Sequence, residues 1–241
     1  MRAAVHTGQL LQPVPGGIGR YITHLLDALP GAGVAPIPFA AGAREGVDLG
    51  WPRGALRYEL WHRMRWPRLR IDADVVHATS LAIPPAGSRP LVVTVHDIVF
   101  LRQPELLTTR GVAFHRRGLD LARRHAAAVV VPTEFGRDDL AREGFDPARV
   151  HVAPHGVDVP RPSDLPPPVD GPYLLFVSTI EPRKGVNELL DAHERLRRSH
   201  PDLQLVLAGP PGWGTPPDTD RPGVVVTGNL GDDELDAAYR G

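Results

Sequence analysis

Short runs of apolar residues recur along the chain, and stretches with helical spacing separate many of them. Most runs are continuously apolar rather than alternating, which is what parallel strands buried on both faces require. The helical stretches place apolar residues three and four positions apart, as in residues 17–29 and 186–200. Strand followed by helix, repeated, predicts an α/β fold of the doubly wound type. The predicted strands are residues 74–78, 90–97, 127–133, 149–154, 173–179, 203–209 and 223–229.

A proline-rich stretch interrupts this alternation. Residues 159–172 contain six prolines in fourteen positions, and such a segment is stiff and extended rather than helical. It predicts a first domain over residues 1–158, a linker over 159–172 and a second domain over 173–241. The second part has only about 70 residues and one complete predicted helix, which leaves much of a sheet exposed. We therefore expect the second domain to be incomplete.

Composition narrows the class of protein without identifying a function. The chain is 42% hydrophobic and 23% charged with a formal net charge of -1, as in an ordinary globular protein. No strong basic field points to nucleic acid, and the absence of cysteine excludes disulfides and thiolate metal sites. Neither a signal segment nor a stretch long enough to span a membrane is visible. These features predict a cytoplasmic protein that does not bind nucleic acid.

Lys184 is the single lysine in a chain with 27 Lys and Arg residues. An arginine bias in the composition explains part of this, but an ammonium is a compact point charge that suits a crowded site. Arg183 and Lys184 follow the predicted strand 173–179 and precede a predicted helix. Two cations at the positive end of a helix suit a polyanion, most simply a diphosphate. The alternative is a solvated loop, since short charge runs are usually exposed.

Glycines mark a second candidate phosphate site near the N-terminus. Gly16, Gly17 and Gly19 stand at the start of the amphipathic segment. Without side chains, the backbone there can approach a ligand closely, and the free N–H groups of a helix start attract an anion. A tight turn that begins a helix explains the same residues without any ligand.

His96 and Asp97 end the predicted strand 90–97. Ligands of open parallel sheets bind at the carboxyl ends of the strands, and a histidine there can exchange protons near neutral pH. This position predicts a catalytic role for the pair, whereas the alternative is a polar pair that caps the next element. His77 occupies a similar strand end without an acidic neighbour, which favours a structural role.

Taken in chain order, eight segments resemble the large glycosyltransferase family with the two-Rossmann GT-B fold, often called glycosyltransferase family 4. That family includes retaining mannosyl- and glucosyltransferases of bacterial polysaccharide and glycolipid synthesis. The resemblance therefore implies two Rossmann-like domains, with the acceptor on the first and the donor on the second. The segments are GGIGRY, DVVHATS, VVTVHDIVF, VVVPTEFGRDDL, VHVAPHGVD, LLFVSTIEPRKGVNELLDAHERL, LVLAGPPGW and GNLGDDELDAAY.

The resemblance also implies a role for each candidate residue. The Gly16–Gly17 loop would approach the diphosphate of a nucleotide-sugar donor. His96, with Asp97 beside it, would lie by the reacting sugar. Arg183 and Lys184 would hold the phosphates from the second domain, which would account for the lysine.

The chain departs from the family pattern in three respects. His155 stands where members usually have asparagine, and Thr133 where serine is common. The family continues beyond the last matching segment into one with two glutamates separated by seven residues, which bind the ribose and flank the sugar. Because those glutamates have no counterpart within the 241 residues, we expect this chain alone to be inactive.

The resemblance predicts sugar transfer from a nucleotide-sugar donor, with GDP-mannose slightly favoured by EPRK, to a glycan or lipid-linked acceptor. We expect no cofactor and no metal, because no acidic cluster is visible and Arg183 with Lys184 can neutralise the leaving diphosphate. Residues 57–70 are rich in arginine and tryptophan and suit peripheral contact with the inner face of a membrane, although an ordinary surface helix explains them too. Two other interpretations stay open. One is a non-catalytic remnant, or the first piece of a split protein completed by another chain; the other is a different GT-B enzyme, such as a nucleotide-sugar epimerase.

Overall fold

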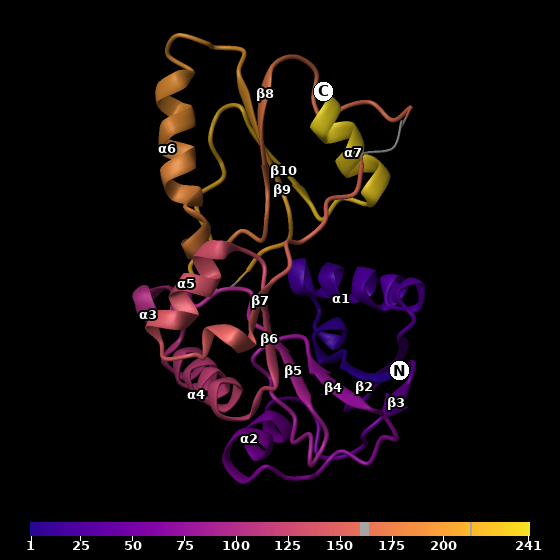
Figure 1. Cartoon of the computed structure of the whole chain (residues 1–241). Coiled ribbons are helices and arrows are strands. Elements are labelled where there is room, and N and C mark those ends of the chain that lie inside the picture. Colours follow the sequence, from indigo (N-terminus) through magenta and orange to yellow (C-terminus); the bar gives the residue numbers. More distant parts are fainter. Residues whose placement is uncertain (160–163, 213) are drawn as a thin grey trace. The chain divides into compact units, whose positions relative to one another are not determined.

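The computed structural model describes residues 1–159, 164–212 and 214–241, and it divides into two compact units, Met1–Gly156 and Val157–Gly241 (Figure 1). Each unit contains a parallel sheet with helices, which confirms the predicted α/β fold. Of the predicted linker, residues 160–163 lie outside the described residues, and residues 164–172 form neither helix nor strand.

Seven parallel strands form the sheet of the first unit, in the order β3-β2-β1-β4-β5-β6-β7. The four strands predicted in this part of the chain are all present, and three further strands precede them. The strands are β1 (Arg2–His6), β2 (Ala35–Ala40), β3 (Val47–Asp48), β4 (Val75–Ala78), β5 (Leu91–Thr94), β6 (Ala128–Val131) and β7 (Val150–Val152).

Prolines explain why sequence patterns miss β2. This strand contains Pro36 and Pro38, which cannot donate a backbone hydrogen bond. The Ala35 amide donates to Met1 O on the β1 side (2.9 Å), and amide direction alternates along a strand, so both proline nitrogens face away from β1. On that other side, β3 pairs with β2 only beyond Pro38. The two prolines therefore remove no bond from the sheet.

Crossover connections place helices on both faces of this sheet. The chain moves from β1 to β2 in one direction and from β3 to β7 in the other. Right-handed crossovers therefore put α1 on one face and α2, α4 and α5 on the opposite one. Thr133 caps α5 by accepting from Gly136 N (3.0 Å), so the threonine keeps the hydroxyl that serine would supply there. The helices are α1 (Gly16–Ala28), α2 (Gly54–Met64), α3 (Val99–Arg102), α4 (Thr109–His125) and α5 (Glu134–Arg142).

Helix α2 uses much of its arginine and tryptophan for packing. Arg57, Trp61 and His62 are buried. The Arg57 guanidinium donates to the backbone carbonyls of Leu49 (2.9 Å) and Gly50 (3.1 Å), which fixes the preceding loop. These side chains are not available to a membrane. Four large apolar side chains on or beside α2 do remain exposed, namely Trp51, Leu56, Met64 and Trp66.

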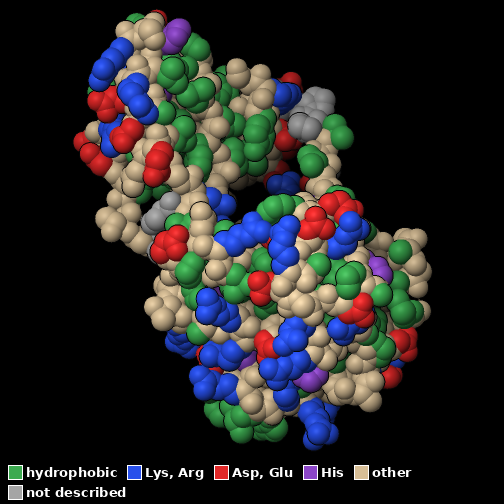
Figure 2. All heavy atoms as spheres, turned by 60° about the vertical axis from the view of Figure 1, so that its left-hand side comes forward, with side chains coloured by type: hydrophobic (Ala, Val, Ile, Leu, Met, Phe, Trp, Pro, Cys, Tyr) green, Lys and Arg blue, Asp and Glu red, His purple; other side chains and the backbone are tan. Residues whose placement is uncertain are grey.

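Charged side chains are spread over the surface of the first unit. Figure 2 shows arginines interspersed with acidic residues on its visible face, in line with the net charge of -1. Hydrophobic side chains gather at its lower end in that view. Across the ranges that the structure describes, no helix has both the length and the apolar character needed to cross a membrane.

The second unit contains the three strands that the sequence predicts, in the parallel order β10-β9-β8. Leu205 and Leu207 of the central strand pack against Val186 and Leu190 of α6. The last helix, expected only to begin, runs for nine residues and lies on the opposite side of the sheet from α6 (Figure 1). The elements are β8 (Tyr173–Val177), α6 (Val186–Leu196), β9 (Gln204–Ala208), β10 (Val224–Gly228) and α7 (Asp232–Arg240).

Helix coverage of this second sheet is best over its central strand. Leu205, Val206 and Leu207 are fully buried, whereas Leu174 on β8 is 37% exposed and Val226 on β10 is 46% exposed. The outer strands therefore keep apolar surface in contact with water. Tyr173 OH donates to Ala238 O (2.7 Å) and ties β8 to α7.

Candidate functional site

The first sheet has a topological switch point between β1 and β4. These strands are neighbours, and the chain leaves them in opposite directions. Such a point leaves a crevice outside the carboxyl ends of the strands, where open α/β sheets bind ligands. Polar side chains from four different elements meet there: Tyr21 of α1, Thr94 at the end of β5, and His96 and His155 in the loops after β5 and β7.

Two hydrogen bonds hold the His96 ring. Its Nε2 lies 2.9 Å from Thr79 O, and a carbonyl only accepts, so Nε2 carries the proton. Nδ1 is then the acceptor, and it lies 3.2 Å from Nε2 of His155, which must donate. The partners thus fix one tautomer of His96 and the orientation of its ring. The Tyr21 ring packs edge-on against His96 at a centroid distance of 5.1 Å.

Burial keeps this histidine uncharged at neutral pH. Desolvation is the main cause that lowers the pKa of His96; the Thr79 carbonyl opposes the shift, and His155 adds to it. Burial raises the pKa of the Tyr21 hydroxyl, which hydrogen bonds with Thr94 Oγ1 (2.9 Å). The His77 Nε2 atom contacts the same Thr94 oxygen (2.8 Å), and burial lowers the pKa of His77 to about 4. Neutral, hydrogen-bonded His77 is in keeping with a structural role.

Asp97 makes a different contact from its neighbour. Its side chain is exposed, and Oδ1 accepts from the Val99 amide (3.1 Å) at the start of α3. This is the capping contact that was the alternative interpretation from the sequence. A part for Asp97 in catalysis stays a prediction.

Gly16 and Gly17 form the first turn of α1, whose leading N–H groups have no partner inside the helix. Gly16 has φ +62°, a conformation that favours glycine, whereas a side chain at either position would meet no atom within 4 Å. The space in front of these glycines is therefore open. Tyr21, one turn further along α1, contacts His96, so the structure brings the helix start and His96 to the same end of the sheet.

Arg183 and Lys184 lie in the second unit, in a 3-10 turn (Pro182–Lys184) between β8 and α6. Arg183 forms an ion pair with Glu181, whose side chain is only 8% exposed. Lys184 is exposed, and within the described residues its ammonium has no ion pair. The two cations are therefore not equivalent: Glu181 already neutralises one of them, a partner that the sequence reasoning missed.

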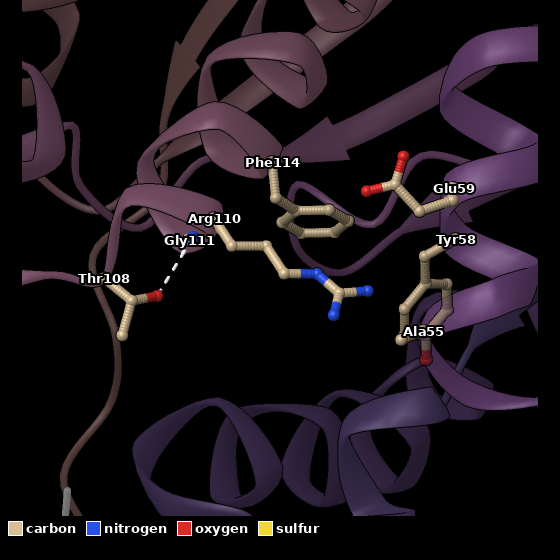
Figure 3. A pocket seen from close by; sticks show the side chains of 7 residues that line it. All are labelled: Ala55, Tyr58, Glu59, Thr108, Arg110, Gly111 and Phe114. Atoms are coloured by element: carbon tan, nitrogen blue, oxygen red, sulfur yellow. Dashed lines mark hydrogen bonds between the residues drawn. The ribbon is translucent and has the colours of Figure 1, made fainter.

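A pocket of about 290 Å³ lies in the first unit between α2 and the start of α4. Figure 3 shows Tyr58 and Glu59 on the α2 side and Phe114 and Arg110 on the α4 side. The sequence reasoning did not identify this pocket, because its walls come from segments some fifty residues apart. The one local signal was the spacing of Arg110 and Phe114, which places both on one face of a helix.

Metal binding finds no support in the described part of the chain, where no three His, Asp or Glu side chains are grouped so as to hold an ion. The expectation that no metal takes part stays a prediction.

Two family models match the chain one after the other. Residues 15–161 match the model described as Glycosyltransferase Family 4, and residues 161–239 match the model described as Glycosyl transferases group 1. Among curated proteins, the chain is 29% identical over 220 residues to a D-inositol 3-phosphate glycosyltransferase of Xylanimonas cellulosilytica, covering 77% of this chain and 50% of that protein. It is 31% identical over 198 residues to an alpha-D-kanosaminyltransferase of Streptomyces kanamyceticus, covering 73% of this chain and 51% of that protein.

The chain thus spans about half the length of these curated relatives. Among solved structures, it resembles the Anabaena protein HepE in complex with UDP-glucose, with a TM-score of 0.63. The two are 18% identical, and the match covers 99% of this chain and 72% of that one. This likeness bears on the fold.

Proposed function

The chain belongs to the glycosyltransferase family that the two matching models describe, and from this premise we propose that it moves a sugar from a nucleotide-sugar donor to an acceptor hydroxyl. The observation that carries the proposal is the match of both models in chain order over residues 15–239. The polar groups at the switch point of the first sheet support it, since they lie where an α/β sheet binds its ligand.

We assign His96 to the reacting sugar and the first turn of α1, with Gly16 and Gly17, to the donor diphosphate. His96 is neutral and oriented by Thr79 and His155, so it offers a fixed dipole rather than a charge. The open space before the two glycines lets a phosphate reach the N–H groups of the helix start.

Lys184 is the main phosphate contact of the second unit in this proposal. Its ammonium stands exposed at the start of α6, whereas Arg183 is held by Glu181. The helix start adds a positive dipole end beside the lysine. Arg183 then contributes less to phosphate binding, because Glu181 offsets its positive charge, and its ion pair mainly orients the loop.

The proposed reaction breaks the bond between the anomeric carbon and the β-phosphate oxygen, and a new bond forms from the acceptor oxygen to that carbon. The nucleoside diphosphate leaves with the bonding electrons, and its β-phosphate oxygen takes up the proton that the acceptor hydroxyl gives up. Charge that develops on the leaving phosphate is stabilised by Lys184 and by helix N–H groups. By family resemblance, the configuration at the anomeric carbon is retained.

The finer assignments follow the family. We propose a glycan or lipid-linked acceptor and keep GDP-mannose as one donor to test beside UDP-glucose, the ligand named for the Anabaena structure. Contact with the inner face of a membrane would fall to the exposed Trp51, Leu56, Met64 and Trp66, because Arg57 and Trp61 are buried.

Calorimetric titration with UDP, GDP and the corresponding monophosphates tests the donor site first. We expect one diphosphate to bind tighter than its monophosphate. A transfer assay then uses the matching nucleotide sugar and a panel of acceptors on a protein whose second domain is complete, with His96→Ala as the matched variant. His96→Ala should lower kcat while leaving nucleotide affinity unchanged.

The same assay separates the other interpretations. A non-catalytic remnant would bind the nucleotide without releasing product. The first piece of a split protein would also bind without releasing product until the chain that completes it is added. An epimerase would convert the sugar with no acceptor present. Absence of preference for a diphosphate over a monophosphate would contradict the proposed donor site.

A further inference from the structure

Three aromatic rings form a closed triangle at the switch point of the first sheet. The Tyr21 ring of α1 lies 5.1 Å from that of His96 and 5.0 Å from that of His155, measured between centroids. The two histidine rings lie 5.2 Å apart, so each ring of the triangle contacts the other two. The planes of Tyr21 and His96 meet at 83°, which is the edge-to-face arrangement that aromatic pairs prefer. A rotation of the His96 side chain would therefore displace Tyr21.

Tyr21 is itself fixed at the far end of its ring. Its hydroxyl shares a hydrogen bond with Thr94 Oγ1 (2.9 Å), and the same oxygen lies 2.8 Å from His77 Nε2. Thr94 is buried at the end of β5. A threonine hydroxyl donates one hydrogen bond and also accepts, so it can serve both neighbours at once. The Tyr21 ring is thus held by the helix at one end and by the sheet at the other.

Tyr21 also holds the residue that donates to His96. His155 is an exposed loop residue beyond the end of β7, and its Nε2 lies 3.2 Å from His96 Nδ1. A hydrogen bond from an exposed side chain orients its acceptor only if the donor is itself restrained, because a free donor would keep its rotamer entropy. The Tyr21 ring packs against both histidines, so one side chain restrains both partners of this bond.

We infer that Tyr21 is a positioning residue for His96: its ring holds the His96 and His155 rings together, and its hydroxyl is anchored on Thr94. The orientation of His96 stands on these contacts alone. Its importance for sugar transfer rests on the proposed function.

The place of Tyr21 on α1 adds a second consequence for the donor. Gly17 and Tyr21 are four positions apart, so they lie on the same side of this helix. Tyr21 therefore connects the helix start assigned to the diphosphate with His96, which is assigned to the sugar. Because one donor has to reach both groups at once, a fixed spacing between them should contribute to catalysis by positioning.

Nuclear magnetic resonance of the histidine rings tests the orientation on the full chain, without any assay of transfer. Long-range proton–nitrogen spectra tell a protonated ring nitrogen from an unprotonated one, and the His96 signals are assigned by their loss in His96→Gln. We expect the parent chain to hold neutral His96 with the proton on Nε2, the atom that faces Thr79 O. Tyr21→Ala should give a mixture of both tautomers, whereas Tyr21→Phe keeps the ring and should keep one.

The same spectra give the pKa of His96. The titratable groups that face His96 are Tyr21 from α1, His77 from β4, His155 from the loop after β7 and its own neighbour Asp97. Burial is the main cause that lowers the pKa of His96, so Tyr21→Ala should raise it towards the ordinary 6.5 by admitting water. A tyrosine is uncharged in this pH range, so the shift reports the cover that its ring provides.

The matched control is Leu25→Ala, which truncates another half-buried side chain one turn further along α1. It should leave the tautomer and the pKa of His96 unchanged. The same changes in Leu25→Ala as in Tyr21→Ala would overturn the inference, because they would reveal a general loosening of α1. A single tautomer and an unchanged pKa in Tyr21→Ala would overturn it as well. If Tyr21→Ala lowers the melting temperature strongly, Tyr21→Leu fills more of the space and provides the same test.

Turnover measures what this orientation contributes, on a protein whose second domain is complete. Tyr21→Ala should lower kcat by about tenfold or more and leave nucleotide affinity unchanged. Tyr21→Phe should lower kcat by a few fold, but not in a Thr94→Val background, where the hydroxyl has already lost its partner. Equal losses in both backgrounds would overturn the anchoring role of Thr94. A disordered His96 ring with full turnover would leave Tyr21 as its positioning residue and remove only the proposed role of His96 in transfer.

Discussion

The two units contain the same kind of sheet but are stabilised to different degrees. Among the described residues, the main core of the first unit contains twenty-four buried apolar side chains and that of the second contains four. The first unit can therefore also bury polar groups such as His6, His62 and Arg57, each packed or hydrogen bonded. The second unit also buries Glu181 and His193, but the two cations of its charged loop, Arg183 and Lys184, are exposed. The polar groups of the candidate site in the first unit are thus fixed by packing, whereas the loop cations of the second unit lie in contact with water.

Acid should destabilise the first unit more than the second, and this is the largest expected difference between them. Burial lowers the pKa of His6, His62 and His77 to about 4, and all three lie in the first unit. Between pH 6.5 and 4 the unfolded chain binds protons that the folded unit excludes, so the free energy of unfolding falls as pH falls. Each histidine contributes about 1.4 kcal/mol per pH unit in that window, or about 4 kcal/mol per unit for the three.

Hydrogen exchange followed by mass spectrometry, corrected for intrinsic rates, measures this loss in peptides of each unit. His77→Gln should flatten the pH dependence by about a third, whereas His151→Gln, at an exposed position, should not change it. Equal loss of protection in both units on acidification would break the comparison.

Truncation of one core side chain should unfold the second unit but not the first. Leu190→Ala removes one of the four side chains in the main core of the second unit, and Leu140→Ala removes one of the twenty-four in that of the first. Each is fully buried, so each should cost about 2–5 kcal/mol. We expect Leu190→Ala to abolish protection throughout the second unit, whereas Leu140→Ala leaves the first folded. Retained protection across β8–β10 in Leu190→Ala would show a second core larger than its four residues.

The two cations of the second unit's charged loop, Lys184 and Arg183, should contribute unequally to nucleotide binding. Lys184→Ala should weaken nucleoside diphosphate binding by about 1.5–3 kcal/mol, the scale of a charge-assisted hydrogen bond. Arg183→Ala should cost less, because Glu181 already pairs with Arg183. Calorimetry on both variants checks this order, and a larger loss for Arg183→Ala would reverse the assignment of the main phosphate contact.

Sequence patterns predict most of this fold because buried parallel strands carry a strong local signal. All seven predicted strands are present, and the ones missed are β1, β2 and β3. β1 has two alanines and one valine between Arg2 and His6, β2 contains two prolines, and β3 has only two residues, so none carries a long apolar run. The candidate site is less accessible to such reasoning. The strand-end position of His96 follows from the chain, but its contact with His155 joins residues 59 positions apart.

Two other features depend on packing rather than pattern. Glu181 comes just before the 3-10 turn that contains Arg183, and only the fold decides that they pair rather than point into water. The Arg110 pocket depends on how α2 lies against α4. Both features change the expected chemistry, one by neutralising a cation and the other by placing Arg110 in the wall of a pocket beside Glu59.

The smallest expected effect concerns His155, which stands where the family usually has asparagine and donates to His96. His155 lowers the pKa of His96, so its removal should raise that pKa slightly. If transfer needs neutral His96, the acid limb of the pH–rate profile should move to higher pH in both His155→Asn and His155→Leu. Asparagine can still donate to Nδ1 and should keep kcat on the alkaline plateau, whereas leucine leaves that nitrogen unpaired and should lower it by a few fold, about 1 kcal/mol. If both variants shift the acid limb equally and have the same kcat on the alkaline plateau, then His155 acts through charge alone and does not position the His96 ring.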